Sequence, residues 1–386
     1  MANLQVNLIS CWYKEKSCGR FAYNLARALE KLGVKITVIS ANCLCFREDP
    51  FNPKLFFSPC KRIKFADFYW KPAPKIINYF RSVGQLTGDA LKGYRYLQKI
   101  NSPLLHYQQI QGSFGFLPLL SLLSCPTNAK RIITVHEIDI LQKQFKFRSK
   151  AFSTIKLNKI YNKADAVIVQ NTAMKNVLEN LGVSSKKIHV IPHGTHIPKL
   201  KTYYRDQIIF CGGHHLTSGK GFDIFLKALL ILNRQNIKPK VTIYGLNPEY
   251  GQEKGKKLIS KLGIHNQIKW FDYKTDDALL EEFQRSMFMV TPYTTSEAGA
   301  AVTTAMANAV PVIATRNVGL PEYLGDDGIY INENDPKYLA DKMAQLINNN
   351  ALRQTLSIRL YNRAVKFYSW EVIAQKTLEL YKKVLS

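Results

Sequence analysis

Apolar positions along the chain follow two spacings that alternate from its first residues. Residues 4–10 begin with alternating apolar and polar side chains and end in an apolar run, which predicts a β-strand. A helical spacing follows from Phe21 to Leu32 and ends at Gly33, and 34–39 predicts a second strand. This order predicts a βαβ unit with Gly19 in the turn before the helix, where a ligand or acceptor could approach the backbone.

The rest of the first half is less regular. The pattern from 42 to 101 is irregular, and strands are predicted at 131–135, within 164–172 and within 187–194. His136 follows the strand 131–135 at its carboxyl end, where ligands of α/β sheets bind. A histidine at such a place either meets a ligand or satisfies backbone groups, and the pattern alone leaves both open.

The second half alternates strands and helices from Gln207 onward. Predicted strands lie at 207–211, 240–244, 268–271, 288–292 and 310–314, with helices between them and a polar helix from Asp335. At 386 residues the chain exceeds the size at which one core usually keeps growing. The sequence therefore predicts an α/β protein with two doubly wound, Rossmann-like domains, joined by the polar, basic stretch 195–206.

A glycine-rich loop separates the strand 207–211 from the next helix. It reads Gly212-Gly213-His214-His215-Leu216-Thr217-Ser218-Gly219-Lys220-Gly221-Phe222-Asp223. Glycines let backbone N–H groups approach a phosphate, and the Lys220 ammonium supplies the opposite charge. It is not a Walker loop, because Gly221 and not Ser or Thr follows Lys220. The loop predicts a phosphate-binding site.

The most informative stretch is 296–324, SEAGAAVTTAMANAVPVIATRNVGLPEYL. It predicts a loop, a helix of small residues over 300–309, a short strand over 310–314 and a loop with Gly319, Pro321 and Glu322. Glu297 falls at the helix start and Glu322 just past the strand, so both carboxylates are expected to face one crevice. An acid that merely favours the helix dipole is the alternative for Glu297.

This stretch resembles the donor-binding motif of retaining GT-B glycosyltransferases of family 4, the glycosyl transferases group 1. The matching segments are Ser296-Glu297-Ala298-Gly299, Ala305-Met306-Ala307, Pro311-Val312-Ile313-Ala314-Thr315 and Gly319-Leu320-Pro321-Glu322. The family's second Glu aligns with Thr304, which keeps Ala-Met-Ala and the proline in register, or with Ala305 if the usual gap is kept. Lys220, Gly221 and Asp223 match a second motif, in which Gly213 or His214 stands at the family's Arg position.

The resemblance covers nearly the whole chain, and it implies two Rossmann-like domains facing a central cleft. They would span 1–195 on the acceptor side and 196–370 on the nucleotide-sugar side, with a C-terminal helix over 371–386 packing back on the first domain. The implied activity is that of a retaining hexosyltransferase, which moves a sugar from a nucleotide-sugar, UDP- or GDP-linked, to a glycan or lipid-linked acceptor. The implied enzyme needs no cofactor, since the nucleotide-sugar is a substrate.

The same resemblance suggests roles for individual residues. Lys220 would neutralise the leaving diphosphate, with backbone N–H groups after Gly212 and Gly213 and around Gly319, and Glu297 would hold the sugar or its developing positive charge. Thr304 would replace a ribose-binding Glu, Glu322 would orient its loop, and His136 would contact the sugar or acceptor. Gly19 would lie on the acceptor side. No metal is expected, because the lysine and helix dipoles can carry the charge.

The distribution of charge along the chain indicates which kind of partner the protein could bind. The net charge is +26, and residues 1–195 hold 29 basic against 10 acidic residues. The runs 61–71 and 143–152 interleave cations with aromatic rings, which is typical either of a membrane interface or of a solvated surface. An anionic membrane surface is the expected partner, and a lysine-rich surface kept for solubility is the alternative.

The start of the chain and its cysteines favour the cytoplasm. No secretory signal opens the sequence, the longest apolar stretch, 114–125, is too short to span a membrane, and the seven scattered cysteines form no metal-binding spacing. Two rival functions stay open: a catalytically degenerate GT-B protein that acts as a binding or partner subunit, and a nucleic-acid binder. The sequence disfavours the second, because no recognition motif accompanies the charge.

Overall fold

The chain folds into two compact units. A computed structural model of the protein describes residues 4–10, 17–40, 102–108, 128–136, 158–201, 203–212, 219–244, 253–271, 276–294, 299–316, 319–332 and 334–386. Unit 1 comprises 1–170, 175–191 and 374–386, and unit 2 comprises 171–174 and 192–373. The chain thus passes to unit 2 at Pro192 and returns at Ala374, compared with the boundaries of 195 and 371 that we expected.

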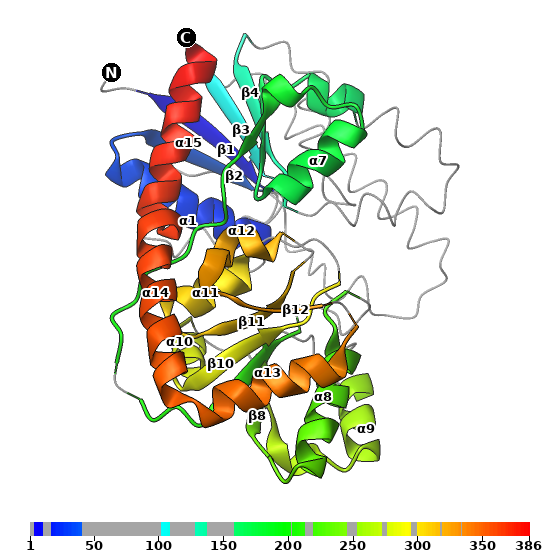
Figure 1. Ribbon diagram of the computed structural model, residues 1–386. Coiled ribbons are helices and arrows are strands. Elements are labelled where there is room, and N and C mark those ends of the chain that lie inside the picture. The colour runs from blue at the N-terminus through cyan, green and yellow to red at the C-terminus, as the bar shows by residue number, and fades with distance from the viewer. Residues whose placement is uncertain are drawn as a thin grey trace, which may run out of the picture. The chain divides into compact units, whose positions relative to one another are not determined.

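Unit 1 is built on a parallel sheet with the strand order β2-β1-β3-β4-β5-β6 (Figure 1). The order reverses beside β1, because β2 lies on one side of it and all later strands on the other. Such a reversal is where doubly wound sheets bind ligands. The elements are β1 (Gln5–Ser10), α1 (Ser17–Lys31), β2 (Lys35–Ser40), β3 (Leu104–Gln108), β4 (Lys130–Thr134), β5 (Ala166–Val169), α7 (Thr172–Asn180), β6 (Ile188–Val190) and the C-terminal helix α15 (Trp370–Leu385).

Unit 2 repeats the plan with the strand order β12-β11-β10-β7-β8-β9, again entirely parallel. Its reversal point lies between β7 and β10. The strands are β7 (Gln207–Cys211), β8 (Lys240–Tyr244), β9 (Ile268–Phe271), β10 (Ser286–Thr291), β11 (Val312–Thr315) and β12 (Ile329–Ile331). The helices are α8 (Phe222–Arg234), α9 (Glu253–Lys261), α10 (Asp276–Gln284), α11 (Ala300–Ala307), α12 (Leu320–Leu324), α13 (Pro336–Asn348) and α14 (Asn350–Tyr368).

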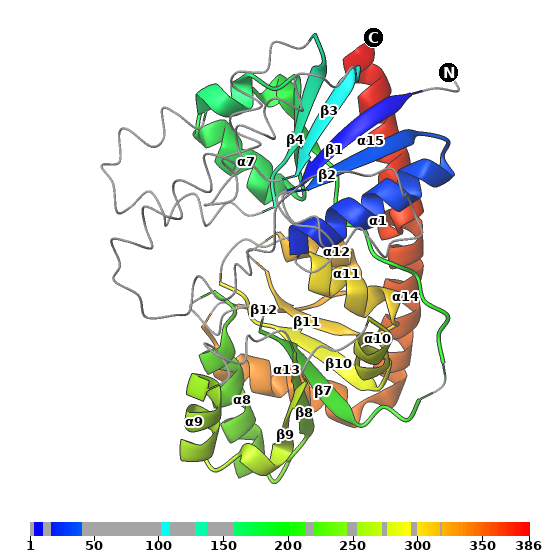
Figure 2. The same ribbon diagram turned by 180° about the vertical axis from the view of Figure 1, so that it is seen from behind.

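Alternate residues of each central strand in unit 2 enter two different cores. Ile208 and Phe210 of β7 pack with apolar residues of α8, α9 and α13, whereas Ile209 and Cys211 pack with those of α10, α11 and α14. Figures 1 and 2 show these helices on the two faces of the sheet. Both faces are therefore buried, which explains why the strands read as continuous apolar runs instead of alternating ones. The prediction of two doubly wound, Rossmann-like α/β units is confirmed.

The sequence pattern did not predict three of the elements. The strands β3 and β12 were not predicted, and the expected loop around Pro321 contains the short helix α12. Gly19 lies inside α1, which begins at Ser17, so it is not in the turn that we expected before the helix. The expected linker also differs, since the Thr195 backbone bonds to Tyr368 and Trp370 and belongs to unit 2.

Replacing Gly221 with Ala should destabilise the protein far more than the same change at Gly263. Both glycines have positive φ, at 62° and 69°, which costs an alanine about 1 to 2 kcal/mol. A Cβ at Gly221 would in addition lie 2.0 Å from the Pro292 carbonyl oxygen, whereas nothing lies within 4 Å at Gly263. We expect Gly221→Ala to lower the free energy of unfolding by at least about 3 kcal/mol in urea titrations. Equal losses in the two variants would contradict this packing.

Candidate functional site

The carboxyl ends of β7 and β10 in unit 2 are joined by a set of close backbone contacts. Gly219, with φ 123°, accepts a hydrogen bond from the Thr294 N–H at 2.9 Å, and Gly221 packs on the Pro292 carbonyl. The Tyr293 hydroxyl donates to the Cys211 carbonyl at 3.0 Å. Because these are the strands on either side of the reversal point, Gly219, Lys220 and Gly221 at the end of the loop are held where a doubly wound sheet binds its ligand.

Lys220 lies between the two glycines of this contact. Its ammonium nitrogen is 4.2 Å from the centre of the Tyr293 ring, and Tyr293 itself is buried. A cation this close to an aromatic face is attracted to it, so the ring holds the ammonium at the end of the sheet. Sequence reasoning singled out Lys220 and missed Tyr293, since an aromatic residue after a strand carries no distinctive pattern.

Helix α11 places Thr304 one turn from its own start. The Thr304 hydroxyl donates to the Ala300 carbonyl at 2.8 Å, and the side chain is half-buried. The hydroxyl hydrogen is therefore used within the helix, and only the oxygen lone pairs remain for a ligand. At the helix start, Gly299 lies against the Tyr323 ring, where a Cβ would be 2.5 Å from a ring carbon.

Glu322 points its carboxylate at the chain's own backbone. Its two oxygens accept the Thr172 N–H at 2.8 and 2.9 Å, and one of them also accepts the Thr172 hydroxyl at 3.0 Å. Thr172 is the first residue of α7. Glu322 therefore accepts a backbone N–H that has no partner within the helix, and its negative charge is stabilised by the positive end of the helix dipole. Gly319, with φ 77°, faces Asn171, whose side chain caps the same helix through Met174 N–H at 2.8 Å. The sequence predicted that Glu322 faces the ligand crevice, and it did not predict that Glu322 binds Thr172.

The end of β11 contributes two further polar groups. Thr315 is 1% exposed, and within the described part of the chain its hydroxyl has no hydrogen-bond partner. Arg316, the next residue, is exposed and has its guanidinium 4.8 Å from the centre of the Tyr330 ring. A buried hydroxyl without a partner is uncommon, and it marks the edge of β11 as a place where a polar ligand group would be accommodated.

In unit 1, His136 lies at the carboxyl end of β4 and is 6% exposed. Its Nε2 lies 2.9 Å from the Gln108 side-chain oxygen, and its Nδ1 lies 2.8 Å from the Gln170 side-chain nitrogen. Phe21 packs edge-on against the imidazole with ring centres 4.6 Å apart. Since Phe21 is two residues after Gly19, the first turns of α1 lie beside His136, and the structure brings these two predicted residues into one region of unit 1.

Several predicted features lie outside the described residues. These are Glu297, Gly213, His214, His215, the cation and aromatic runs 61–71 and 143–152, and the apolar stretch 114–125. Their predicted roles stay predictions. Of the cysteines, Cys211 is a buried thiol on β7, and the other six lie where no side chain is described.

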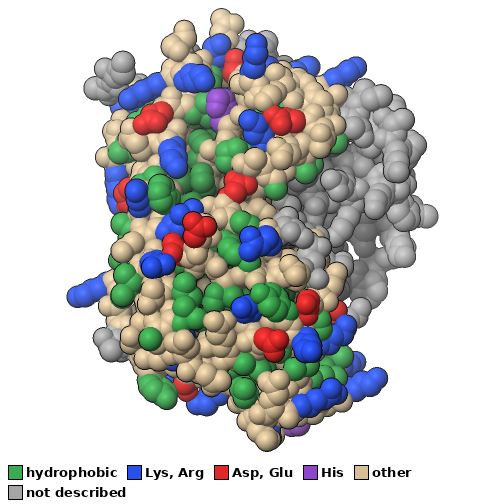
Figure 3. Space-filling view, viewed as in Figure 1, with side chains coloured by type: hydrophobic (Ala, Val, Ile, Leu, Met, Phe, Trp, Pro, Cys, Tyr) green, Lys and Arg blue, Asp and Glu red, His purple; other side chains and the backbone are tan. Residues whose placement is uncertain are grey.

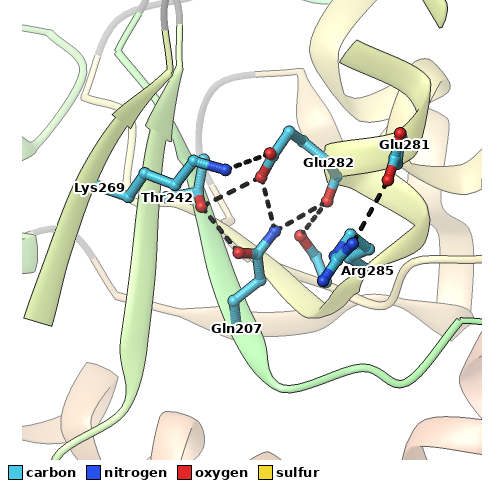
Figure 4. A network of polar contacts seen from close by, with 7 residues as sticks. Gln207, Thr242, Lys269, Glu281, Glu282 and Arg285 are labelled. Atoms are coloured by element: carbon cyan, nitrogen blue, oxygen red, sulfur yellow. Dashed lines mark hydrogen bonds and ion pairs between the residues drawn. The ribbon is translucent and has the colours of Figure 1, made fainter. Parts of the chain in front are cut away.

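A cavity of about 400 Å³ lies by the amino-terminal ends of β7 and β8, at the opposite edge from Lys220. Figure 4 shows its polar wall, in which Gln207 and Thr242 bond to each other and to the Glu282 carboxylate, and Lys269 forms an ion pair with Glu282. Arg285, the residue after α10, pairs with Glu281 of that helix at 3.3 Å. Because these groups satisfy one another, the network fastens α10 to the sheet, and we assign no ligand to the cavity.

Among the described residues, no three or more His, Cys, Asp and Glu side chains are placed to hold a metal. None of the described helices has the length and apolar character of a membrane span. Asp276 and Asp277 open α10, and Asp326 and Asp327 lie in a 3₁₀ turn. On the face drawn in Figure 3, cationic side chains are scattered among acidic ones and do not gather on one element.

The sequence and fold match known glycosyltransferases. Residues 18–197 match the family model "Glycosyltransferase Family 4", and residues 195–363 match "Glycosyl transferases group 1". Together the two models cover residues 18–363, so both halves of the chain match glycosyltransferase families. An uncharacterised glycosyltransferase of Methanocaldococcus jannaschii is 26% identical over 328 residues, which cover 79% of this chain and 82% of that protein. For three other curated relatives the match spans 29, 64 and 40% of their length, less than two thirds.

Solved structures of glycosyltransferases share the fold. A Rickettsia africae glycosyltransferase superposes with a TM-score of 0.74 at 19% identity and covers all of both chains. Anabaena HepE in complex with UDP-glucose superposes with a TM-score of 0.72 at 14% identity, covering 98% of this chain and 100% of HepE. At these identities the similarity shows that this chain shares the fold of these glycosyltransferases.

Lowering the pH from 7 to 5 should destabilise the protein through His106 of β3. Burial lowers the pKa of His106 to about 3, whereas an unfolded histidine takes up its proton near pH 6.5. The stabilisation is thus complete above pH 6.5 and is lost as the pH falls from 6.5 toward 3. Between pH 7 and 5 we expect this residue to account for a loss of about 2 kcal/mol in the free energy of unfolding.

Urea titrations of the parent and of His106→Gln at both pH values measure this difference. The variant should lose less stability than the parent on acidification by about that amount. His265→Gln, which changes an exposed histidine of unit 2, is the matched control and should behave as the parent does. Parallel losses in parent and His106→Gln would contradict the assignment.

Proposed function

We propose that the protein is a retaining glycosyltransferase, which moves a hexose from a UDP- or GDP-sugar to a glycan or lipid-linked acceptor. The observation that carries the proposal is Lys220, held over Tyr293 at the reversal point of unit 2. A nucleotide-sugar breaks between its anomeric carbon and the diphosphate, so charge develops on the phosphate oxygens. An ammonium fixed at the carboxyl edge of the sheet suits that charge, and HepE, which shares the fold, was crystallised with UDP-glucose.

The remaining donor contacts follow from the same edge of unit 2. Backbone N–H groups after Gly212 and Gly213 and around Gly319 would support Lys220 at the diphosphate, and Glu297 would hold the sugar or its developing positive charge. Thr304 would accept a hydrogen bond from a ribose hydroxyl, because its own hydrogen is already bonded to Ala300. With the lysine and the backbone carrying the charge, the proposed mechanism needs neither metal nor cofactor.

We place the acceptor on unit 1, beside His136 and Gly19. The acceptor oxygen bonds to the anomeric carbon as the bond from that carbon to the diphosphate breaks, the acceptor proton passes to the departing diphosphate, and the sugar keeps its anomeric configuration in the product. Glu322 supports the donor site indirectly, since its carboxylate is bonded to Thr172 and fixes the turn that carries Gly319. The protein would act in the cytoplasm, where nucleotide-sugars are available.

Nucleotide-sugars should raise the melting temperature of the parent, and the change Lys220→Gln should weaken this effect. Loss of one charge-assisted contact to phosphate is expected to lower donor affinity about 10- to 100-fold. A thermal-shift and calorimetric screen of UDP-, GDP- and ADP-sugars measures it. The matched control is Lys227→Gln. Lys227 lies on α8 and forms an exposed ion pair with Asp223, so this variant should bind the donor as the parent does.

Transfer assays on the donor found in the screen extend the test. Glu297→Gln should bind the donor and transfer sugar much more slowly. A parent that binds no nucleotide-sugar and hydrolyses none would overturn the proposal and favour a binding or partner subunit. Equal donor affinity in Lys220→Gln and Lys227→Gln would overturn the role of Lys220 alone.

We further propose that the basic first half contacts an anionic membrane surface, which would suit a lipid-linked acceptor. The net charge of +26 and the cation and aromatic runs 61–71 and 143–152 support this proposal. The protein should sediment with vesicles that contain anionic phosphatidylserine and less with purely zwitterionic ones, and added salt should release it. Sedimentation that does not depend on anionic lipid would contradict it.

A further inference from the structure

A continuous chain of buried hydrogen bonds links His136 to the C-terminal helix. Tyr381 of α15 lies 2.6 Å from Nδ1 of His106, whose Nε2 lies 2.7 Å from the Thr134 hydroxyl and 3.1 Å from the Gln108 amide nitrogen. Gln108 then bonds to His136, which bonds to Gln170. All six side chains are at most 6% exposed, so water does not compete for their polar atoms.

The donors and acceptors in this chain determine one another. The Gln108 amide nitrogen can only donate, so in this arrangement Nε2 of His106 accepts from Gln108 and from the Thr134 hydroxyl, and the His106 proton is on Nδ1, where it is donated to Tyr381. The Gln108 amide oxygen can only accept, so Nε2 of His136 must carry a proton. The two histidines are therefore held as opposite neutral tautomers.

The same logic limits how His136 can meet a substrate. Nδ1 of His136 accepts from Gln170 and Nε2 donates to Gln108, so both ring nitrogens are engaged. A sugar hydroxyl that takes the place of Gln170 must donate its hydrogen to Nδ1. The tautomer thus decides which kind of group the ring can bind.

We propose that Tyr381, His106 and Gln108 are positioning residues for His136, which they hold with its proton on Nε2, so that α15 controls the tautomer at the acceptor side. The chemical part of the proposal concerns unit 1 alone, and its catalytic consequence rests on the proposed function. Removing the Tyr381 hydroxyl would leave the Nδ1 proton of His106 without its acceptor. The proton would move to Nε2, the Gln108 and Gln170 amides would both turn over, and His136 would take its proton on Nδ1, donated to the Gln170 oxygen.

Long-range ¹H–¹⁵N spectra of the full chain with ¹⁵N-labelled histidine test this coupling, with His106→Gln and His136→Gln to assign the signals. The parent should show His106 protonated on Nδ1 and His136 on Nε2, and Tyr381→Phe should show both reversed. Tyr368→Phe, which removes a buried hydroxyl bonded to Glu322 and Tyr323 in unit 2, is the matched control and should leave both signals unchanged. An unchanged His136 signal in Tyr381→Phe, or a parent with the opposite tautomers, would overturn the proposal.

A second variant serves if Tyr381→Phe does not fold. Gln170→Leu removes the other side chain that bonds to His136, so only Gln108 then fixes the tautomer, and His136 should keep its proton on Nε2. A mixture of tautomers, or a proton on Nδ1, in this variant would overturn the proposal.

Transfer kinetics separate the coupling from the proposed function. Reversed tautomers with about tenfold lower kcat and an unchanged KM for the donor would support the positioning role. Reversed tautomers with unchanged kcat would overturn it. A parent that transfers no sugar would refute the proposed function, and the spectra would still decide whether α15 sets the tautomer.

Discussion

Burial of both faces of each parallel sheet is the constraint from which the rest of the structure follows. In unit 2 the side chains of β7 alternate between a core shared with α8, α9 and α13 and one shared with α10, α11 and α14. A sheet covered on both faces can offer a ligand only the edge where its strands end. The glycines of the loop after β7 meet β10 at that edge, and the same packing that fixes Gly221 against Pro292 puts Lys220 over Tyr293.

Most of the elements could be predicted from the sequence, because buried parallel strands are apolar runs separated by helical spacing. The strands 207–211, 240–244 and 268–271 have the predicted bounds. By contrast, β3 contains His106 and Gln108, whose polar side chains interrupt the apolar pattern although both are fully buried. Helix α12 is only five residues long and begins with Gly and Pro around Leu320, which is the composition of a loop.

The site residues divide in the same way. Lys220 and Thr304 could be predicted as site residues from the sequence because each occupies a position in a local motif. Neither Tyr293 nor Thr172, the partner of Glu322, could be predicted from the sequence. The local pattern does not show which ring lies beneath a lysine. It also does not show which residue binds a carboxylate when the two are 150 residues apart. His136 was expected to present its imidazole to a substrate, and the structure shows both ring nitrogens engaged by glutamines from β3 and the end of β5.

The bond between His106 and Tyr381 joins residues 275 positions apart in the chain. Every strand of unit 1 leaves the ribosome long before Tyr381 does, so for most of synthesis the sheet is present while an imidazole in its interior lacks its final partner. An unpaired polar group of this kind weakens the packing around it. Completion of the first unit is therefore delayed until the last helix has been made, and a chain truncated shortly before its end would carry an unfinished N-terminal half as well as a missing tail.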